Sequence, residues 1–311
     1  MLISIITPTL NAGKTLGETL ESVRLQLDHD VEHLLIDAGS TDETLKIAAD
    51  HPTLTVVSEP DDGIYDGMNK GARMALGEWL LFMQADDWLP EGSLNAFRRM
   101  ISEYPDTSMI CGGAEAVRLS EGRWTCVWKV EQREQKTLTI RNIALGEPMI
   151  NARLIRRDVF WKLGGFSQEY SLASDRDFLL RAAEAGIGQK ELTVMTYRYR
   201  WHIGSSTMTE GNSLSGKLRK ENLDIARNHL GWTDDADQAE IRKWHSRLSV
   251  EGAMNALESA NAGEFLDNLR QGCRVEPFWP IQLLAEILKS FPSFLARGGR
   301  TKSRLIKEST P

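Results

Sequence analysis

The sequence has few cysteines, no long apolar run and no excess of positive charge. Its three cysteines, Cys111, Cys126 and Cys273, are widely spaced and form no CxxC pair, which argues against a disulfide framework or a structural zinc site and favours a reducing compartment. The formal net charge of −7 gives no overall basic footprint for nucleic acid. No stretch reaches the roughly 18 consecutive apolar residues of a membrane span, and the short apolar run at the start lacks the basic region of a signal peptide. These absences predict a cytoplasmic protein and leave attachment to a membrane surface open.

Residues 1–105 alternate between strand and helix patterns. Apolar runs at 2–7, 33–37, 54–57 and 79–83 are typical of buried strands. Between the strands, apolar residues recur at helical spacing, as they do at Leu16, Leu20, Val23 and Leu27. This alternation predicts an α/β fold, with a Rossmann-like, mostly parallel sheet and flanking helices on both of its faces.

The pattern changes near residue 105 and again near residue 206. Residues 106–206 mix helical patterns with short strands, two of which are joined by a turn at 120–123. Residues 207–311 have a helical pattern throughout and end in a basic tail that contains Phe291, Phe294, Arg297, Arg300, Lys302, Arg304 and Lys307. We therefore expect one domain over 1–206, with halves of about 1–105 and 106–206, and a helical C-terminal extension over 207–311. The tail predicts peripheral contact with an anionic membrane, and a docked helix with a solvated tail is the alternative.

Polar residues gather at the carboxyl ends of the predicted strands, where ligands bind in open parallel sheets. They are Thr7-Pro8-Thr9, Asp37, the run 59–62 and Asp86-Asp87. Two adjacent carboxylates both stay ionised only with a cation nearby or with full solvation. Manganese or magnesium (Mn2+ or Mg2+) binds carboxylates together with substrate phosphates. The Asp86-Asp87 pair therefore predicts a metal-assisted phosphate site, unless it only begins the turn before Pro90.

Four motifs occur in the order found in family 2 glycosyltransferases, which have the GT-A fold. The opening strand 3–11 resembles that of the family, and Ile-Asp-Ala-Gly-Ser-Thr-Asp at 36–42 resembles its second-strand motif. Residues 58–71 are similar to a segment of one bacterial branch, and Gln84-Ala85-Asp86-Asp87 stands where the family has its metal-binding DxD-like motif. Looser agreement extends to about residue 206. The resemblance implies a GT-A glycosyltransferase of the bacterial polysaccharide-biosynthesis type.

The resemblance also implies a role for each matching residue on the donor side. Nucleotide-sugar contacts are expected from Thr7, Pro8, Thr9, Asn11, Asp37, Asn69, Lys70 and Asp86, with Asp37 at the base edge and Asp86 at the ribose. Asp87 is expected to bind the metal, and His202 to be a further metal ligand, as a late histidine is in some GT-A enzymes. The alternatives are Asp37 as a turn cap, Lys70 as a solvated helix lysine and His202 as a structural histidine.

The family places its catalytic base at the start of a helix after a Gly-Gly-Phe turn. In this chain Gly164-Gly165-Phe166 is followed by Ser174-Asp175-Arg176-Asp177. By this resemblance Asp175 takes the proton of the acceptor hydroxyl, which is a poor nucleophile without a base. Alternatively, Asp175 only interacts favourably with the helix dipole. Asp177 is the next candidate for the base. One departure weakens inference about the acceptor, because 148–152 lacks the histidine that members often carry there.

These features predict an inverting, metal-dependent transfer of a sugar from a UDP- or GDP-type nucleotide diphosphate sugar to a saccharide or lipid-linked saccharide acceptor. The reaction is expected in bacterial cell-surface polysaccharide or glycolipid biosynthesis, in the cytoplasm or at the inner face of the cell membrane. Two alternatives stay open: a nucleotidyltransferase, although 9–14 makes a poor phosphate loop, and a non-catalytic nucleotide-sugar-binding scaffold. No GxGxxG follows the first strand, which disfavours a dehydrogenase, and no nucleic-acid partner is expected.

Overall fold

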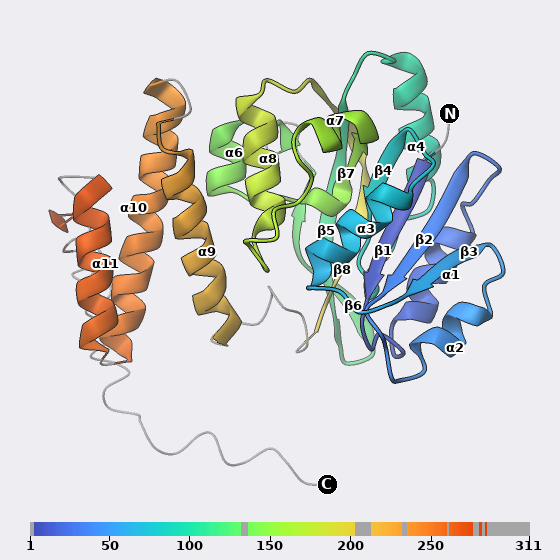
Figure 1. The fold of residues 1–311 in the computed structure, drawn as a ribbon, viewed down its shortest axis with the longest axis horizontal. Helices are drawn as coiled ribbons and strands as arrows, with labels where there is room; N and C mark the ends of the chain where they lie inside the picture. The colour runs from blue at the N-terminus through green and yellow to red at the C-terminus, as the bar shows by residue number, and fades with distance from the viewer. Residues whose placement is uncertain are drawn as a thin grey trace, which may run out of the picture. The chain divides into compact units, whose positions relative to one another are not determined.

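A single mixed sheet forms the framework of the first two hundred residues. The structure is a computed structural model that describes residues 3–131, 136–202, 213–231, 235–259 and 261–275, together with Pro280, Ile281 and Leu284. Within these residues the sheet has eight strands in the order β3-β2-β1-β4-β7-β5-β6, and β8 pairs with β5 (Figure 1). The predicted α/β fold with flanking helices is confirmed.

The first half of the sheet is parallel, as predicted. β1 (Ile3–Thr9) lies between β2 (Val31–Asp37) and β4 (Trp79–Phe82), and β3 (Leu54–Ser58) pairs with β2. The helices of this half are α1 (Leu16–Arg24), α2 (Thr44–Ala49), α3 (Ile64–Met74) and α4 (Ser93–Glu103). The parallel register places Thr9 beside Asp37, and Asp37 beside Ser58. The polar ends of three strands therefore lie together.

The second half of the sheet is mixed. β7 (Arg153–Arg156) is antiparallel to β4 and to β5 (Met109–Ser120), and β5 pairs antiparallel with β6 (Arg123–Val130) but parallel with β8 (Gln189–Trp201). The tight turn after Ser120 forces the antiparallel pairing of β5 and β6. The connecting helices are α6 (Ile140–Leu145), the 3-10 helix η1 (Ile150–Ala152), α7 (Arg157–Lys162) and α8 (Ser174–Glu184). The mostly parallel arrangement of the prediction thus describes the first half better than the second.

Apolar side chains alternate between the two faces of the sheet, because successive residues of a strand point in opposite directions. On one face Ile5 and Leu81 belong to a buried cluster with Val23 of α1 and Phe97 of α4. On the other face Phe82 contacts an aromatic group made of Phe160, Phe166 and Phe178, with neighbouring ring centroids 4.9–5.4 Å apart. This second group lies directly beneath the segment that leads into α8.

Helix α3 lies unusually close to β1 and β2 because glycines face the sheet. A Cβ atom added at Gly71 would collide with the side chain of Ile6, and one at Gly67 would lie 3.3 Å from the Cβ of Pro8. No larger residue fits at Gly71 without a shift of the helix. The close approach fixes the position of α3 against the sheet, and with it the positions of other α3 side chains, including Tyr65 and Asn69.

The chain divides into two compact units, residues 1–221 with 231–240 and residues 222–230 with 241–311. Helices α9 (Ser213–His229) and α10 (Asp235–Glu258) contribute to both units, and α11 (Ala262–Val275) belongs to the second. In the second unit Val250 and Ala253 pack with Phe265 and Leu269. A helical C-terminal region is therefore confirmed. The units separate after Glu221, and the predicted domain boundary at residue 206 stays a prediction.

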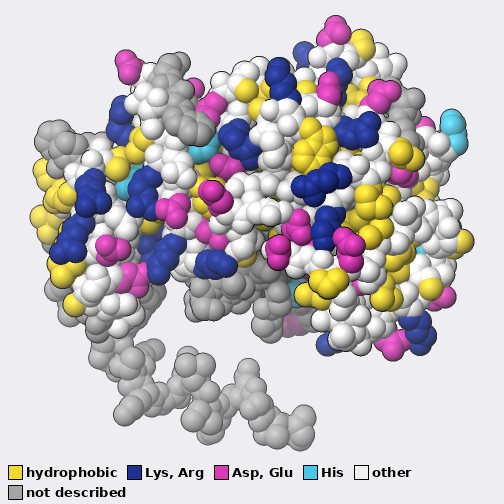
Figure 2. Space-filling model, in the orientation of Figure 1, with side chains coloured by type: hydrophobic (Ala, Val, Ile, Leu, Met, Phe, Trp, Pro, Cys, Tyr) yellow, Lys and Arg dark blue, Asp and Glu magenta, His cyan; other side chains and the backbone are white. Residues whose placement is uncertain are grey.

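None of the helices in the described part of the chain combines the length and apolar character needed to cross a membrane. Basic side chains lie over α10 and α11, with acidic side chains among them, on the face drawn in Figure 2. The predicted basic tail, from Phe291 onward, falls outside the described residues. Its contact with an anionic membrane stays a prediction.

Candidate active site

The loops that follow β1 and β2 are joined by hydrogen bonds. Asn11 adopts the left-handed region at φ 52° and accepts the Thr41 N–H at its Oδ1 (2.9 Å), while its own N–H donates to Ser40 Oγ (2.7 Å). The Gly13 N–H donates to Asp42 Oδ2 at 2.9 Å. The Ser-Thr-Asp turn after β2 therefore shapes the loop after β1. A contact between Asn11 and a nucleotide stays a prediction.

Asp37, at the end of β2, is fully buried. Its carboxylate accepts the N–H groups of Gly39 (3.1 Å) and Ser40 (3.0 Å) and the hydroxyl of Ser58 (2.6 Å). Burial by itself raises the pKa of Asp37, but the hydrogen bonds from Ser40, Ser58 and Gly39 outweigh burial and hold that pKa below its ordinary value. Asp37 therefore orders this turn as an ionised carboxylate, and its predicted contact with a base edge stays a prediction.

The segment Thr7-Pro8-Thr9, which is predicted to contact the nucleotide, forms the last three residues of β1. Thr7 Oγ1 lies 2.9 Å from Nε2 of His33, and burial lowers the pKa of His33 to about 3, so the ring is neutral near pH 7. Thr9 is buried, and its hydroxyl has no hydrogen-bond partner among the described residues. Buried polar groups normally have a partner. A ligand at this strand end could supply one to Thr9.

Asn69 and Lys70 have different surroundings although they are neighbours on α3. The Asn69 side chain is buried and bonds to both backbone groups of Phe166, donating from Nδ2 to the carbonyl (2.8 Å) and accepting the N–H at Oδ1 (3.1 Å). Lys70 Nζ donates to the Pro60 carbonyl (2.7 Å) and lies 3.2 Å from Glu59. Asn69 therefore fastens α3 to the Gly-Gly-Phe turn. The predicted position of both residues beside a nucleotide stays a prediction.

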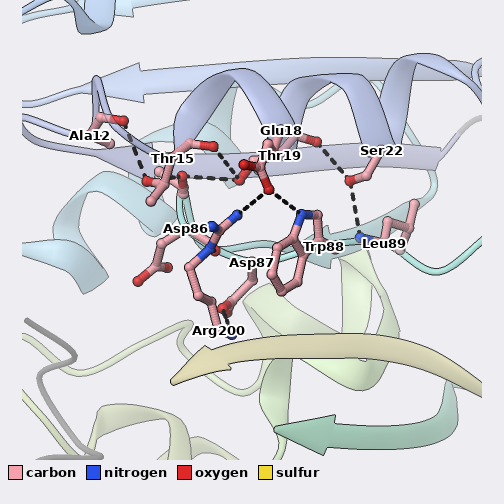
Figure 3. Close-up of polar contacts among 11 residues, drawn as sticks. Ala12, Thr15, Glu18, Thr19, Ser22, Asp86, Asp87, Trp88, Leu89 and Arg200 are labelled. Carbon is pink, nitrogen blue, oxygen red and sulfur yellow. Dashed lines mark hydrogen bonds and ion pairs between the residues drawn. The ribbon is translucent and has the colours of Figure 1, made fainter. Parts of the chain in front are cut away.

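The adjacent carboxylates Asp86 and Asp87 follow β4 and point in different directions (Figure 3). Asp87 is 3% exposed, and its two oxygens accept the Tyr197 hydroxyl (2.7 Å) and the Arg200 N–H (2.8 Å), both from β8. Burial and the Asp86 charge raise the pKa of Asp87 well above its ordinary value, against these two hydrogen bonds and the Arg200 charge. Asp87 thus ties β8 to the end of β4.

Asp86 is the more exposed member of the pair. Its Oδ2 lies 2.9 Å from Nε2 of His202, and its side chain is 33% exposed. Sequence reasoning placed Asp86 at the ribose and gave Asp87 and His202 to the metal. In the structure His202 contacts Asp86, whereas Asp87 contacts Tyr197 and Arg200. The two predicted metal ligands, Asp87 and His202, therefore have different neighbours.

An arginine and two tryptophans support the Asp86 backbone. Arg200 donates from Nε to the Asp86 carbonyl (2.8 Å), and its guanidinium lies 2.7 Å from Glu18 of α1 (Figure 3). The guanidinium also stacks on Trp88, 4.0 Å from the ring centroid, and lies 5.4 Å from that of Trp124. This arrangement restrains the backbone at the acidic pair from the side opposite the Asp86 carboxylate.

Asp175 lies in the first turn of α8 and is partly buried. Its Oδ1 accepts the Tyr65 hydroxyl (3.0 Å) and the Arg176 N–H (2.8 Å). Loss of water contact raises the pKa of Asp175 above its ordinary value, against the Arg176 charge and the hydrogen bonds from Tyr65 and the Arg176 N–H. Asp177, the second candidate, forms an ion pair with Arg181 (2.7 Å) instead.

Asp87 and Asp175 both influence Tyr199 of β8. Burial raises the pKa of Tyr199 well above its ordinary value, and the charges of Asp87, Asp175 and Glu147 raise it further. Both aspartates therefore lie within electrostatic range of one phenol. The structure brings together residues that are nearly 90 positions apart in the sequence.

The Asp86–His202 pair suits a divalent metal that is bound together with a diphosphate better than a metal that is held by protein side chains alone. In the described ranges no three His, Cys, Asp or Glu side chains gather as a metal site. Magnesium and manganese bound with a diphosphate need only one or two protein ligands, because phosphate oxygens and water complete the shell. The Asp86 oxygen and the His202 nitrogen form a hydrogen bond of 2.9 Å that a metal ion would replace, and both side chains are partly exposed, whereas Asp87 is buried.

Several residues of the site were not found by sequence reasoning. Tyr197, Arg200 and Tyr65 each contact one of the candidate aspartates from a distant part of the chain. Their only signal in the sequence is position: Tyr197 and Arg200 stand in the segment 106–206, where short strands are predicted, and Tyr65 stands in the motif 58–71. Neither position reveals which acid the side chain meets.

Comparison with known proteins identifies the family of the chain. The model of Glycosyl transferase family 2 matches residues 4–164. A PGL/p-HBAD biosynthesis glycosyltransferase of Mycobacterium bovis is 34% identical over 186 residues, which are 58% of this chain and 69% of that protein. An uncharacterised glycosyltransferase of Haemophilus influenzae is 28% identical over 183 residues, 58% of this chain and 61% of that protein.

Solved structures of S. aureus TarS are similar in fold. Residues 1–349 of TarS in complex with UDP-GlcNAc match with a TM-score of 0.65 at 20% identity, over 92% of this chain and 85% of that one. A longer TarS structure is covered over 43% of its length, with a TM-score of 0.59. At this level of identity the likeness establishes the fold alone, which is GT-A, as predicted.

Proposed function

The chain belongs to Glycosyl transferase family 2 and is a glycosyltransferase, and from this premise we propose that it transfers one sugar, with inversion, from a nucleotide diphosphate sugar to a hydroxyl acceptor. The proposal rests on one observation above all. A carboxylate pair at the end of β4, held by Tyr197 and Arg200 of β8, is accompanied by a separate, partly buried carboxylate on α8, held by Tyr65. Donor and acceptor sites with separate acids are what a single-displacement transfer needs.

On the donor side, we propose that Asp86 and His202 are the protein ligands of a manganese or magnesium ion, and that Asp87 holds the site together beneath them. This division differs from the one expected from the sequence, where Asp87 was the ligand. Its support is that Asp86 is the exposed acid beside His202, while Asp87 is buried between Tyr197 and the Arg200 N–H. When bound, the metal would offset charge on the leaving diphosphate.

On the acceptor side, Asp175 is the proposed base. It takes the proton of the acceptor hydroxyl as the new C–O bond forms, and one base without a carboxylate nucleophile gives inversion. Its raised pKa makes it a stronger base than an ordinary aspartate, which suits proton transfer near neutral pH. Asp177 is already paired with Arg181.

The wider role is proposed from the relatives. The M. bovis relative is a PGL/p-HBAD biosynthesis glycosyltransferase, and one TarS structure holds UDP-GlcNAc. We therefore propose a UDP-type donor before a GDP-type one, and a saccharide or lipid-linked acceptor in bacterial cell-surface glycan synthesis. Free thiols at Cys111, Cys126 and Cys273 support a reducing, cytoplasmic location.

Donor binding by the full chain tests the division of the acidic pair. UDP and GDP are titrated by calorimetry with and without Mn2+ into the wild type, Asp86→Asn, Asp87→Asn and, as a control, the exposed Asp106→Asn. We expect Mn2+ to tighten UDP binding in the wild type and the control, and this tightening to disappear in Asp86→Asn. In Asp87→Asn it should persist, weakened by about 10- to 100-fold, as for residues that support a metal ligand.

The opposite pattern, with tightening lost only in Asp87→Asn, would return the metal to Asp87. Binding of a nucleoside triphosphate with release of diphosphate would favour a nucleotidyltransferase. Donor binding without hydrolysis or transfer to any acceptor would favour the scaffold.

A further inference from the structure

The two oxygens of Asp175 have different surroundings. Oδ1 accepts two hydrogen bonds, from the Tyr65 hydroxyl and from the Arg176 N–H. The carboxylate also interacts with the N–H of Asp175 itself, and no hydrogen bond from another described residue reaches Oδ2. A carboxylate that accepts two hydrogen bonds on one oxygen is fixed in rotation, and its lone pairs on that oxygen are less basic. Oδ2 is therefore the oxygen available to an acceptor hydroxyl.

Tyr65 can fix Asp175 because the tyrosine is itself held in place. Its ring is 9% exposed and packs on Phe166, with centroids 5.3 Å apart. Asn69, four residues later and thus on the same side of α3, bonds to both backbone groups of Phe166. The helix that carries Tyr65 is therefore attached to the turn on which its ring rests.

The Tyr65 hydroxyl has a second neighbour, the Leu172 carbonyl, at 3.2 Å. This carbonyl belongs to a loop that Glu221 of α9 holds closed. The Glu221 carboxylate accepts the N–H groups of Ser171 (3.1 Å), Leu172 (2.8 Å) and Ala173 (3.0 Å) and the Ser171 hydroxyl (2.9 Å). These donors immediately precede α8, so Glu221 sets the position at which the helix, and Asp175 with it, begins.

We propose that Tyr65 and Glu221 are positioning residues for the base: Glu221 fixes the loop before α8, and Tyr65 holds Oδ1 of Asp175 so that Oδ2 faces the acceptor hydroxyl and receives its proton. The inference rests on the proposed role of Asp175. The acceptor O–H proton moves to Oδ2 while the acceptor oxygen bonds to the anomeric carbon of the sugar. The bond from that carbon to the diphosphate oxygen breaks, and the nucleoside diphosphate leaves with the electron pair. The Tyr65 proton stays on the phenol, which donates to Oδ1 before and after the transfer.

Four titratable groups lie around Asp175: Tyr65 from α3 and Arg176 from α8 act on it directly, Tyr199 from β8 is influenced by its charge, and Glu221 from α9 influences Tyr65. Tyr65 and Arg176 lower the pKa of Asp175, and burial raises it. Loss of the Tyr65 hydroxyl therefore leaves burial less opposed. The pKa of Asp175 should rise, and a larger fraction of the base should be protonated at a given pH.

The test compares Tyr65→Phe with the wild type and with Tyr104→Phe, a tyrosine that contacts Lys190 elsewhere, in a transfer assay in which the UDP-sugar and the acceptor are varied in turn. We expect kcat to fall about 10-fold or more in Tyr65→Phe, because a hydrogen bond to a charged group is lost, with KM for the donor unchanged. The acid limb of the kcat/KM profile should move to higher pH. A merely structural role would not move this limb.

Glu221→Gln provides a second, independent variant, with Asp224→Asn, an exposed acid on the same helix that pairs with Arg227, as its control. The glutamine side chain replaces one acceptor oxygen with an NH2 group, which faces N–H groups that need an acceptor. We therefore expect kcat to fall, while UDP binding and the KM for the donor stay unchanged. Glu221→Asp, which keeps the charge, should recover part of kcat.

Asp175→Asn in the same assay distinguishes failure of the base assignment from failure of the positioning roles. Full activity of Asp175→Asn would remove the base assignment and the positioning role with it. Loss of activity in Asp175→Asn, together with wild-type kcat and pH profile in Tyr65→Phe or in Glu221→Gln, would overturn only the role of that positioning residue.

Discussion

The end of β2 and the start of α8 each hold a buried or partly buried aspartate, but the two carboxyl pKa values shift in opposite directions. Asp37 accepts hydrogen bonds from Gly39, Ser40 and Ser58, and its pKa falls. Asp175 accepts two, both on one oxygen, and its pKa rises. Burial opposes ionisation in both places. The number and distribution of donors decides which effect is larger.

The difference separates a structural carboxylate from a chemical one. At the end of β2 the Asp37 carboxylate stays ionised and orders the backbone around it. An acid with one oxygen left open, and with a raised pKa, is suited to accept a proton. Asp87 is a third case: both of its oxygens accept hydrogen bonds, yet burial and the neighbouring Asp86 charge raise its pKa.

The largest expected effect comes from removing the base at the start of α8. Asp175→Asn keeps the shape of the side chain but cannot take the acceptor proton, so kcat should fall by about 10²- to 10⁴-fold. Calorimetry should show UDP binding close to that of the wild type. Asp158→Asn, an exposed acid of α7 paired with Arg156, is the control. Equal loss of donor binding and turnover would mean that Asp175 acts on the donor side.

Removing the structural acid at the end of β2 should act on stability. Asp37→Asn places an amide among groups that donate hydrogen bonds, which should lower the free energy of unfolding by about 2–4 kcal/mol near pH 7. Because the folded pKa lies below the ordinary value of 3.8, this stability is present above pH 3.8 and is lost as pH falls through the folded pKa. Urea unfolding at several pH values measures the difference, and the exposed Asp50→Asn should show almost none.

A smaller, pH-dependent effect is expected from His33, which contacts Thr7 on the neighbouring strand. Its folded pKa of about 3 lies below the ordinary 6.5, so the unfolded chain takes up the proton first. Stability is therefore complete above pH 6.5 and falls as pH drops toward 3, by about 2 kcal/mol between pH 7 and pH 5. His33→Gln should flatten this slope, and His29→Gln, whose side chain is 90% exposed, should not. An unchanged slope in His33→Gln would assign the titration to other groups.

The sequence was sufficient to predict the strands that carry strong apolar runs and the turn at 120–123. β7 was missed because its four residues, Arg153–Arg156, show no run long enough to distinguish a strand from the helix that follows. Without β7, the antiparallel strand between β4 and β5 could not be predicted. Short elements owe their structure to the neighbours they pair with, and their own residues carry little of the signal.

The same limit applies to the candidate site. The acidic pair and Asp175 could be proposed from local motifs, because each motif lies within a few consecutive residues. The division of labour between Asp86 and Asp87 could not, because it depends on Tyr197 and Arg200, more than one hundred positions away in the chain. Which oxygen of Asp175 is open likewise depends on Tyr65, 110 positions earlier.

Three consecutive backbone N–H groups before α8 share a single anion, and that anion comes from outside the family-matched segment 4–164. A chain shortened to residue 206 would leave these donors without the Glu221 carboxylate. The start of α8, and the position of Asp175 in its first turn, therefore depend on one acidic side chain of α9.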